Sequence, residues 1–246
     1  MKKSWVLLAI IAICVLGCDS AKEEEEDNRP FDASEPYPFL EFSDPEFRKA
    51  FNSQEEMLAA CQLPTGYLKQ ASTENLIASC MNYPLFAIYF AYDNPLDGIN
   101  VIINNFNGFK ELRKRESAAE MIIDYYATME VETTDSPLPV NNSIFHLGFL
   151  ELVLASEIIP DMFSNQNIIK LEKAVSLKFQ DKLKHPDVYS ESSLKWSLLI
   201  GAEICLHKNQ TSFKDKGLLQ FFIKNGGNVD SKVYAYVLLL LQVILS

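Results

Sequence analysis

The clearest structural signal in this chain is the stretch NQNIIKLEKAVSLKFQDKLK, residues 165–184. Its apolar side chains recur every three or four positions and form a single stripe: Ile168, Leu171, Val175 and Phe179. The charged side chains expected to lie off that stripe include Lys170, Glu172, Lys173 and Lys178. One apolar stripe among charged residues predicts an amphipathic helix with one buried face, and Pro186 predicts where it ends.

Similar segments follow one another through the C-terminal half of the chain. Helix-like segments are expected to begin near Asn142, Asn165, Ser190, Thr211 and Asp230. Every second start lies roughly 40–48 residues further on, which is near the helix-pair period of HEAT-type repeats. The sequence therefore predicts an all-α fold of stacked helical hairpins, an α-α superhelix with HEAT-like spacing.

The last segment, Val233 to Leu245, is apolar almost all round. A helix of this kind is buried in a core or lies in a membrane. Because about 13 residues are too few to span a bilayer, which needs about 20, we predict a buried core helix that Asp230 caps. A buried strand is the alternative for such a run of Val and Leu.

Cap residues and prolines predict further helices between residues 44 and 126. Starts are expected at Asp44-Pro45-Glu46, at Ser72-Thr73, at Pro84 and at Asp93-Asn94-Pro95, and a long helix is expected from Phe109 to Tyr126. Only Asn100 to Ile103 is β-like in this region. We predict a single helical domain over residues 46–246, with a candidate subdomain boundary in the proline-containing loop near 133–140.

The first 18 residues predict a lipoprotein signal. Lys2 and Lys3 precede a short apolar run, and Gly17-Cys18 follows it. The run is too short for a membrane span, and a small residue before cysteine is what lipoprotein signal peptidase requires. We therefore predict cleavage after residue 17 and lipid (palmitate) attachment at Cys18, with an ordinary secretory signal or an uncleaved anchor as the alternatives. Two or more acyl chains would anchor the protein stably.

Residues 18–45 predict a disordered tether that is acidic and proline-rich. It contains the block Glu23 to Asp27, which repels itself and stays solvated. Acidic residues directly after a lipidated cysteine resemble the surface-export signal of lipoproteins from gut-dwelling Gram-negative anaerobes. The location implied is the outer membrane, facing outward. Asp19, at the second mature position, suggests inner-membrane retention under the enterobacterial rule and is the competing interpretation.

The net charge restricts the classes of partner that the protein is expected to bind. The formal net charge is -11 and becomes -13 when Lys2 and Lys3 leave with the signal. A protein this acidic is expected neither to bind nucleic acid nor to be attracted by anionic headgroups. Membrane attachment is therefore expected through the N-terminal lipid alone.

Several motifs in the N-terminal half resemble those of a group of uncharacterised surface lipoproteins from gut-dwelling Gram-negative anaerobes. The motifs are Glu56 to Pro64, Ser72 to Ile77, Cys80 to Phe86, and Phe106 to Leu112 with Arg115. The resemblance covers roughly residues 55–126. It implies a surface lipoprotein with a helical fold, and it implies no activity and no functional residues.

Cysteine and histidine give little sign of chemistry. Cys61 and Cys80 are candidates for a disulfide, and the alternative is that they and Cys205 are inert core thiols. The histidines are His146, His185 and His207, and none has a partner at metal-ligand spacing. No metal site and no cofactor are predicted.

The function predicted is a non-catalytic, lipid-anchored envelope protein that binds another protein or a peptide, or serves as a scaffold. The alternative is an envelope hydrolase or a glycan-binding accessory lipoprotein, for which carboxylates that interrupt apolar segments are candidates: Glu151, Glu157, Asp161 and Glu203. Solvated helix faces are the plainer explanation of these acids. Likewise, Arg113-Lys114-Arg115 is expected to pair with the flanking Glu111 and Glu116. The aromatic residues between Tyr83 and Tyr92 could fill a core or line a sugar or peptide groove.

Overall fold

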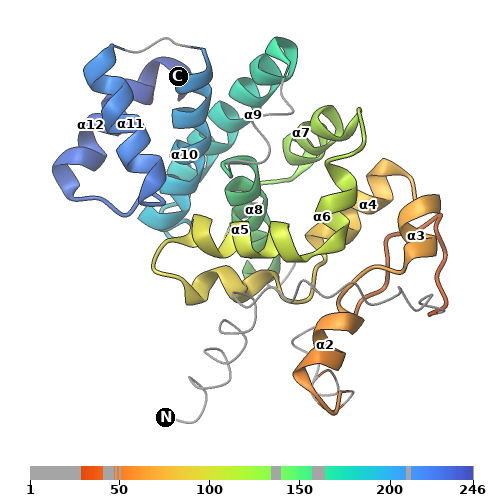
Figure 1. The fold of residues 1–246 in the computed structure, drawn as a ribbon. Helices are drawn as coiled ribbons and strands as arrows, with labels where there is room; N and C mark the ends of the chain where they lie inside the picture. Colours follow the sequence, from red (N-terminus) through yellow and green to blue (C-terminus); the bar gives the residue numbers. More distant parts are fainter. Residues whose placement is uncertain are drawn as a thin grey trace. The chain divides into compact units, whose positions relative to one another are not determined.

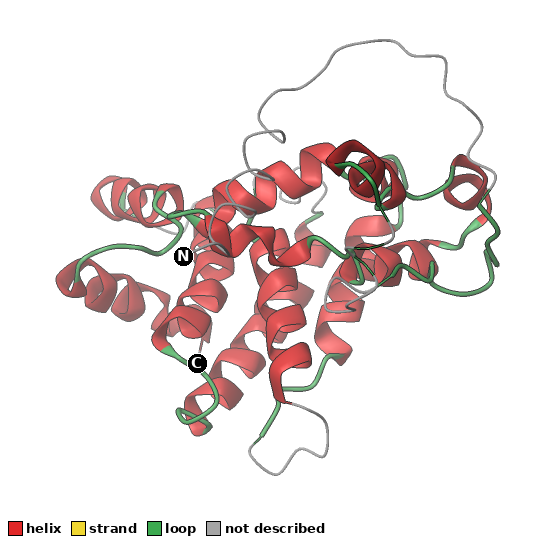
Figure 2. Ribbon diagram, turned by 90° about the horizontal axis from the view of Figure 1, so that it is seen from below, coloured by secondary structure: helices red, strands yellow, loops and turns green. Residues whose placement is uncertain are grey.

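The computed structural model describes residues 29–40, 47, 49, 51–133, 140–156, 164–208 and 212–245. Within these ranges the chain forms eleven α-helices and one 3-10 helix, and no strand (Figure 1, Figure 2). The all-α prediction is confirmed. The chain divides into two compact units, Met1–Ala118 and Ala119–Ser246. The loop near 133–140, predicted as a boundary, falls inside the second unit, and its residues 134–139 lie outside the described ranges.

The first unit contains short helices separated by caps and prolines. They are α2 (Gln54–Ala60), α3 (Thr65–Gln70), α4 (Thr73–Met81), the 3-10 helix η1 (Phe86–Ala91), α5 (Pro95–Asn105) and α6 (Asn107–Leu112). Two predicted caps are confirmed, because the side chains of Ser72 and Asn94 accept hydrogen bonds from the first turns of α4 and α5. The β-like segment Asn100 to Ile103 lies inside α5, where buried isoleucines occupy one helical face.

Helix α2 begins at Gln54. Ser53 is the N-cap of α2, and its hydroxyl accepts a hydrogen bond from the Glu56 N–H at 3.1 Å. The Glu56 carboxylate in turn accepts from the Asn52 N–H at 2.6 Å. This reciprocal capping fixes the start at Gln54. The predicted start at Asp44 lies outside the described residues.

Residues 29–40 belong to the fold, so the predicted tether of residues 18–45 is too long. The Arg29 guanidinium donates to the carbonyl oxygens of Ala60 at 2.5 Å and Gln62 at 2.6 Å. The Tyr37 N–H donates to Ser79 Oγ at 2.8 Å, and the Tyr37 ring is buried. These bonds join the segment to residues more than 30 positions further along the chain. The prolines of the segment did not predict these long-range bonds.

The long helix predicted from Phe109 to Tyr126 is two helices. It breaks into α6 and α7 (Ala118–Thr128), and the backbone between them turns through hydrogen bonds between residues three apart. Arg115 lies in this turn, and its guanidinium donates to the carbonyl oxygens of Leu68 and Ala71, both at 2.8 Å. The last carbonyls of α3 have no intrahelical donors, so these hydrogen bonds stabilise the turn between α6 and α7.

Within its described residues, the second unit contains six helices. They are α7, α8 (Val140–Leu154), α9 (Asn165–Lys184), α10 (Glu191–His207), α11 (Phe213–Lys224) and α12 (Ser231–Leu245). The five predicted starts from Asn142 onward agree with α8 to α12 within two residues. Gly226 and Gly227 have positive φ angles of 56° and 78° and close α11.

Helix α10 is the centre of this unit (Figure 1). It packs against α8, α9, α11 and α12, and α12 also packs against α9. At the α8 contact, a Cβ on Gly148 would lie 2.2 Å from the Trp196 ring, so glycine is what lets the two helices approach. The consecutive helices α9 and α10, α10 and α11, and α11 and α12 pack against each other. The HEAT-like period remains a prediction.

The stripe on α9 is confirmed, with one error beside it. Ile168, Leu171, Val175 and Phe179 are all buried. Lys178, predicted to lie off the stripe, is also buried, with 6% of its surface exposed. Its amine donates to the carbonyl oxygens of Ala127 and Met129 at the end of α7. Those carbonyls lack intrahelical donors, so they can accept hydrogen bonds from the Lys178 amine. These bonds offset the free-energy cost of burying it.

Helix α12 is only half buried, contrary to the prediction of a core helix. One stripe is buried, formed by Val237, Leu241 and Leu245. Leu239 is 59% exposed and Tyr236 is 40% exposed. No helix in the described part of the chain is both long enough and apolar enough to cross a membrane.

Candidate functional site

Two of the carboxylates proposed for hydrolysis lie in the described structure. Glu151 lies on α8 and is completely buried, whereas Glu203 on α10 is partly exposed. Glu157 and Asp161 lie outside the described residues. The surroundings of Glu151 therefore decide what chemistry it can perform.

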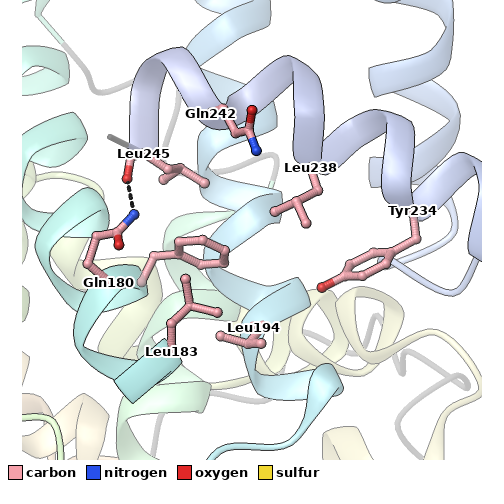
Figure 3. A pocket seen from close by; sticks show the side chains of 8 residues that line it. Gln180, Leu183, Leu194, Tyr234, Leu238, Gln242 and Leu245 are labelled. Atoms are coloured by element: carbon pink, nitrogen blue, oxygen red, sulfur yellow. Dashed lines mark hydrogen bonds between the residues drawn. The ribbon is translucent and has the colours of Figure 1, made fainter. Parts of the chain in front are cut away.

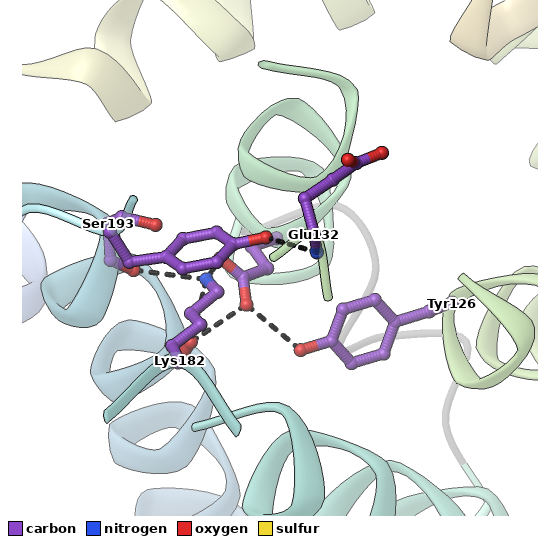
Figure 4. A network of polar contacts seen from close by, with 7 residues as sticks. Tyr126, Glu132, Lys182 and Ser193 are labelled. Atoms are coloured by element: carbon purple, nitrogen blue, oxygen red, sulfur yellow. Dashed lines mark hydrogen bonds and ion pairs between the residues drawn. The ribbon is translucent and has the colours of Figure 1, made fainter. Parts of the chain in front are cut away.

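Glu151 forms a buried ion pair with Lys182 of α9 (Figure 4). The Lys182 amine lies 2.5 Å from Glu151 Oε2, and both side chains are 0% exposed. The other carboxylate oxygen, Oε1, accepts hydrogen bonds from the Tyr126 hydroxyl at 3.0 Å and the Ser197 hydroxyl at 2.7 Å. Each oxygen of Glu151 thus has a donor.

The Lys182 amine is held from several sides. It donates to the carbonyl oxygen of Ser193 and to Ser197 Oγ, both at 3.2 Å. It also lies 5.6 Å from the centre of the Tyr189 ring, whose hydroxyl accepts from the Glu132 N–H at 2.8 Å (Figure 4). The network joins α7, α8, α9 and α10 through side chains that are nearly all buried.

Burial dominates the protonation equilibria of this network. It lowers the pKa of Lys182, and the Glu151 carboxylate opposes that shift. Burial, followed by the same carboxylate, raises the pKa of Tyr126 well above its usual value. Because no atom of Glu151 or Lys182 reaches solvent, a substrate cannot contact them. We conclude that the network fixes the positions of four helices.

Lys182 was missed as a buried residue, although the sequence contained a signal for it. Lys182 follows Val175 by seven positions and Phe179 by three, so it continues the buried stripe of α9. Lys178 follows Leu171 by seven positions in the same way. A lysine at a stripe position indicates an amine that reaches an acceptor inside the fold.

The three cysteines of the described residues are free and buried. Cys61 and Cys80, the candidates for a disulfide, are therefore not bonded to each other in this structure. Burial raises the pKa of Cys61 to about 12 and that of Cys205 to about 11, and it also raises the pKa of Cys80. These thiols stay protonated near neutral pH, where they are poor nucleophiles.

The basic patch serves the fold of the first unit. Lys114 and Arg115 pair with Glu111, at 3.2 Å and 3.7 Å. Arg115 also holds the end of α3, as described above. The expectation of local pairing is therefore confirmed for Glu111.

The aromatic residues near η1 mostly fill a core. Tyr83 stacks on Phe106 with ring centres 4.3 Å apart, and Tyr89 is fully buried. Phe90 is the exposed member of this group. Among the residues that the structure describes, no three His, Cys, Asp or Glu side chains gather where they could hold a metal ion.

The second unit also contains an open groove between α9, α10 and α12, here termed the α9–α12 groove (Figure 3). Its volume is about 400 Å³. It is lined by Phe179, Gln180 and Leu183 of α9, Leu194 of α10, and Tyr234, Leu238, Gln242 and Leu245 of α12. Because the four residues of α12 span three helical turns, the groove is about 16 Å long.

The lining of the groove is mostly apolar and carries no charged side chain. The amide of Gln180 donates to the Leu245 carbonyl oxygen at 2.6 Å, which closes one end (Figure 3). Nearby charges neutralise each other, because Lys184 pairs with Asp181 at 2.6 Å and Lys195 with Glu191 at 2.7 Å. A groove with these properties takes neutral apolar side chains, which is the usual chemistry of a binding pocket of this size.

A smaller pocket of about 220 Å³ lies in the first unit, where Arg29, Tyr37, Phe47 and Cys61 contribute to its walls. Arg29 already binds two backbone carbonyls and lies 5.6 Å from the centre of the Tyr37 ring. Its charge therefore serves the fold, and the α9–α12 groove is the better candidate for a binding site.

Comparisons of the chain with protein-family models, with curated proteins and with solved structures found no match.

Proposed function

We propose that this chain is a lipid-anchored protein of the cell envelope, held at the outer membrane and facing outward, with a non-catalytic binding domain. The lipid anchor is supported by Gly17-Cys18, which stands at the end of a short apolar run that follows Lys2 and Lys3. The acidic block Glu23 to Asp27 supports surface export, as does the resemblance of residues 55–126 to surface lipoproteins of gut-dwelling anaerobes.

The α9–α12 groove supports the binding role. Its uncharged apolar lining fits the apolar face of a protein or peptide segment. Leu183, which lines the groove, is 47% exposed, so apolar surface continues from the groove to the outside of the domain. Contiguous apolar surface that is exposed marks interaction sites, and Leu183 extends the apolar lining of the groove outward.

The alternative, an envelope hydrolase or glycan-binding accessory protein, gains no such support. Of its candidate acids, Glu151 is closed to solvent and paired with Lys182. An acid that acts on a glycosidic bond must reach the bond.

The anchor is tested by fractionation of cells that express the native chain or Cys18→Ala. We expect the native protein in the outer-membrane fraction, with the mass of a lipidated chain beginning at residue 18. Cys18→Ala should lose the lipid and leave the membrane fraction after a carbonate wash. A variant that stays firmly in washed membranes would refute anchoring by lipid alone.

The binding role is tested by reagent access to the groove in a Leu183→Cys variant. Because the native described thiols are buried, a maleimide should label the new thiol selectively. Envelope extract should slow this labelling, whereas it should not slow labelling of Ile169→Cys. Ile169 also lies on α9, is 62% exposed and does not line the groove. Equal labelling with and without extract would contradict the proposal.

A further inference from the structure

The outer face of α12 carries apolar side chains that its neighbours within the described residues leave partly exposed. Tyr236 and Leu239 are both well exposed, and Leu240 beside them is half-buried. These three residues stand at positions i, i+3 and i+4, so they form one ridge along the helix. We name Tyr236, Leu239 and Leu240 the α12 ridge.

The ridge and the α9–α12 groove are neighbouring features of the same helix. Leu238 and Gln242 line the groove, while Leu239 lies one position further round the helix and points outward. Figure 3 shows the side chains of Leu238, Gln242 and Leu245 on the groove side. An apolar ridge at helical spacing is what an apolar groove between helices accepts.

A surface that carries both a ridge and a matching groove is complementary to itself. In a dimer with twofold symmetry, each copy presents the same patch, and every contact occurs twice. We propose that a second copy of this chain occupies the groove: the α12 ridge of each copy packs into the α9–α12 groove of the other. This inference rests on the proposed function, because it takes the groove as a protein-binding surface and names the partner.

The charges around the ridge favour a second copy over a membrane surface. Helices that lie in a membrane interface carry many lysines and arginines on their polar face, and α12 contains only Lys232, in its first turn. The Tyr236 hydroxyl donates to Asp215 Oδ1 at 3.0 Å, which places a carboxylate beside the ridge. Anionic headgroups repel a carboxylate. Between two copies, the paired charges near the groove limit the repulsion of two acidic chains.

The first test is cross-linking of the full chain in its own membrane. Two differently tagged copies are expressed together, one with Leu239→Cys and the other with Leu183→Cys, and treated with a short bismaleimide. We expect a product that carries both tags. In the matched control, Ile169→Cys replaces Leu239→Cys, and we expect little product. No product from the test pair, or equal product from both pairs, would overturn the proposal.

The second test measures the dimer dissociation constant of the purified, detergent-solubilised protein by sedimentation. Leu239→Glu should raise this constant by at least ~100-fold, because two symmetry-related leucine contacts are lost together. Ile169→Glu has a similarly exposed parent residue and should change the constant less than about threefold, since an exposed position outside the contact loses little apolar burial. A monomer at all concentrations for the native protein would overturn the proposal.

A third measurement distinguishes the membrane from a second copy. A fluorophore is attached to Leu239→Cys in vesicles that contain nitroxide-labelled acyl chains. We expect no quenching, and strong quenching would assign the ridge to the membrane and overturn the dimer. Failure of the dimer would still leave the proposed function testable, since protection of Leu183→Cys by envelope extract reports any protein partner.

Discussion

Replacing Lys182 by methionine removes the positive charge that faces Glu151 inside the second unit. The perturbation keeps most of the side-chain volume and removes the ion pair at 2.5 Å. It also removes the bonds to the Ser193 carbonyl oxygen and Ser197 Oγ. Tyr126 and Ser197 still donate to Glu151, but its charge is left buried and without a cation.

The magnitude follows from complete burial of both partners. Removing one partner of a buried ion pair costs about 3–5 kcal/mol, compared with a total free energy of unfolding of roughly 5–15 kcal/mol for a typical domain. The double variant Lys182→Met with Glu151→Gln contains neither buried charge, and the amide oxygen can still accept from Tyr126 and Ser197. We therefore expect the double variant to be more stable than Lys182→Met by about 2 kcal/mol or more.

The assay is urea unfolding followed by the fluorescence of Trp196, which packs on Gly148 of α8 and reports on this unit. The matched control is Lys184→Met, two positions away, whose ion pair with Asp181 is exposed. That change should cost less than about 1 kcal/mol. If Lys182→Met costs no more than the control, or if the double variant is no better than the single, the pair is not buried as described.

The remaining predictions concern packing, the N-terminal segment, pH and export. Phe179→Asp should lower the melting temperature severely, whereas Lys173→Asp should not, because Phe179 is buried and Lys173 is exposed. Deleting residues 29–40 should destabilise the first unit, measured by hydrogen exchange, whereas a chain that begins at residue 29 should match the native protein. Stability measured as the urea midpoint should fall as pH rises above about 10, because the raised pKa of Tyr126 keeps it protonated in the fold while the unfolded chain loses the proton. Changing the acids of residues 23–27 to glutamine and asparagine should leave folding intact but reduce cleavage by protease added to intact cells, and unchanged cleavage would make the acidic block a spacer only.

Local signals predicted several elements of this fold. Ser72 and Asn94 were identified as caps because a cap depends on a side chain and the next three backbone N–H groups. The apolar stripe on α9 was identified because helical periodicity is a property of neighbouring residues. The break between α6 and α7 was missed, since Arg115 binds carbonyls more than 40 positions earlier in the chain.

The sequence by itself determined the all-α class and the helix starts from Asn142 onward, and it predicts the lipid anchor at Cys18. The tertiary structure alone decided which buried polar residues are partners. Lys182 stands at a stripe position of α9, but its pairing with Glu151 is visible only once α8 and α9 bring the two side chains together, because a charge is stable in a core only where its partner is already fixed. The tertiary structure also decided that α12 buries one stripe and leaves Leu239 exposed. A helix that is apolar all round contains no local signal for the side that its neighbours will cover.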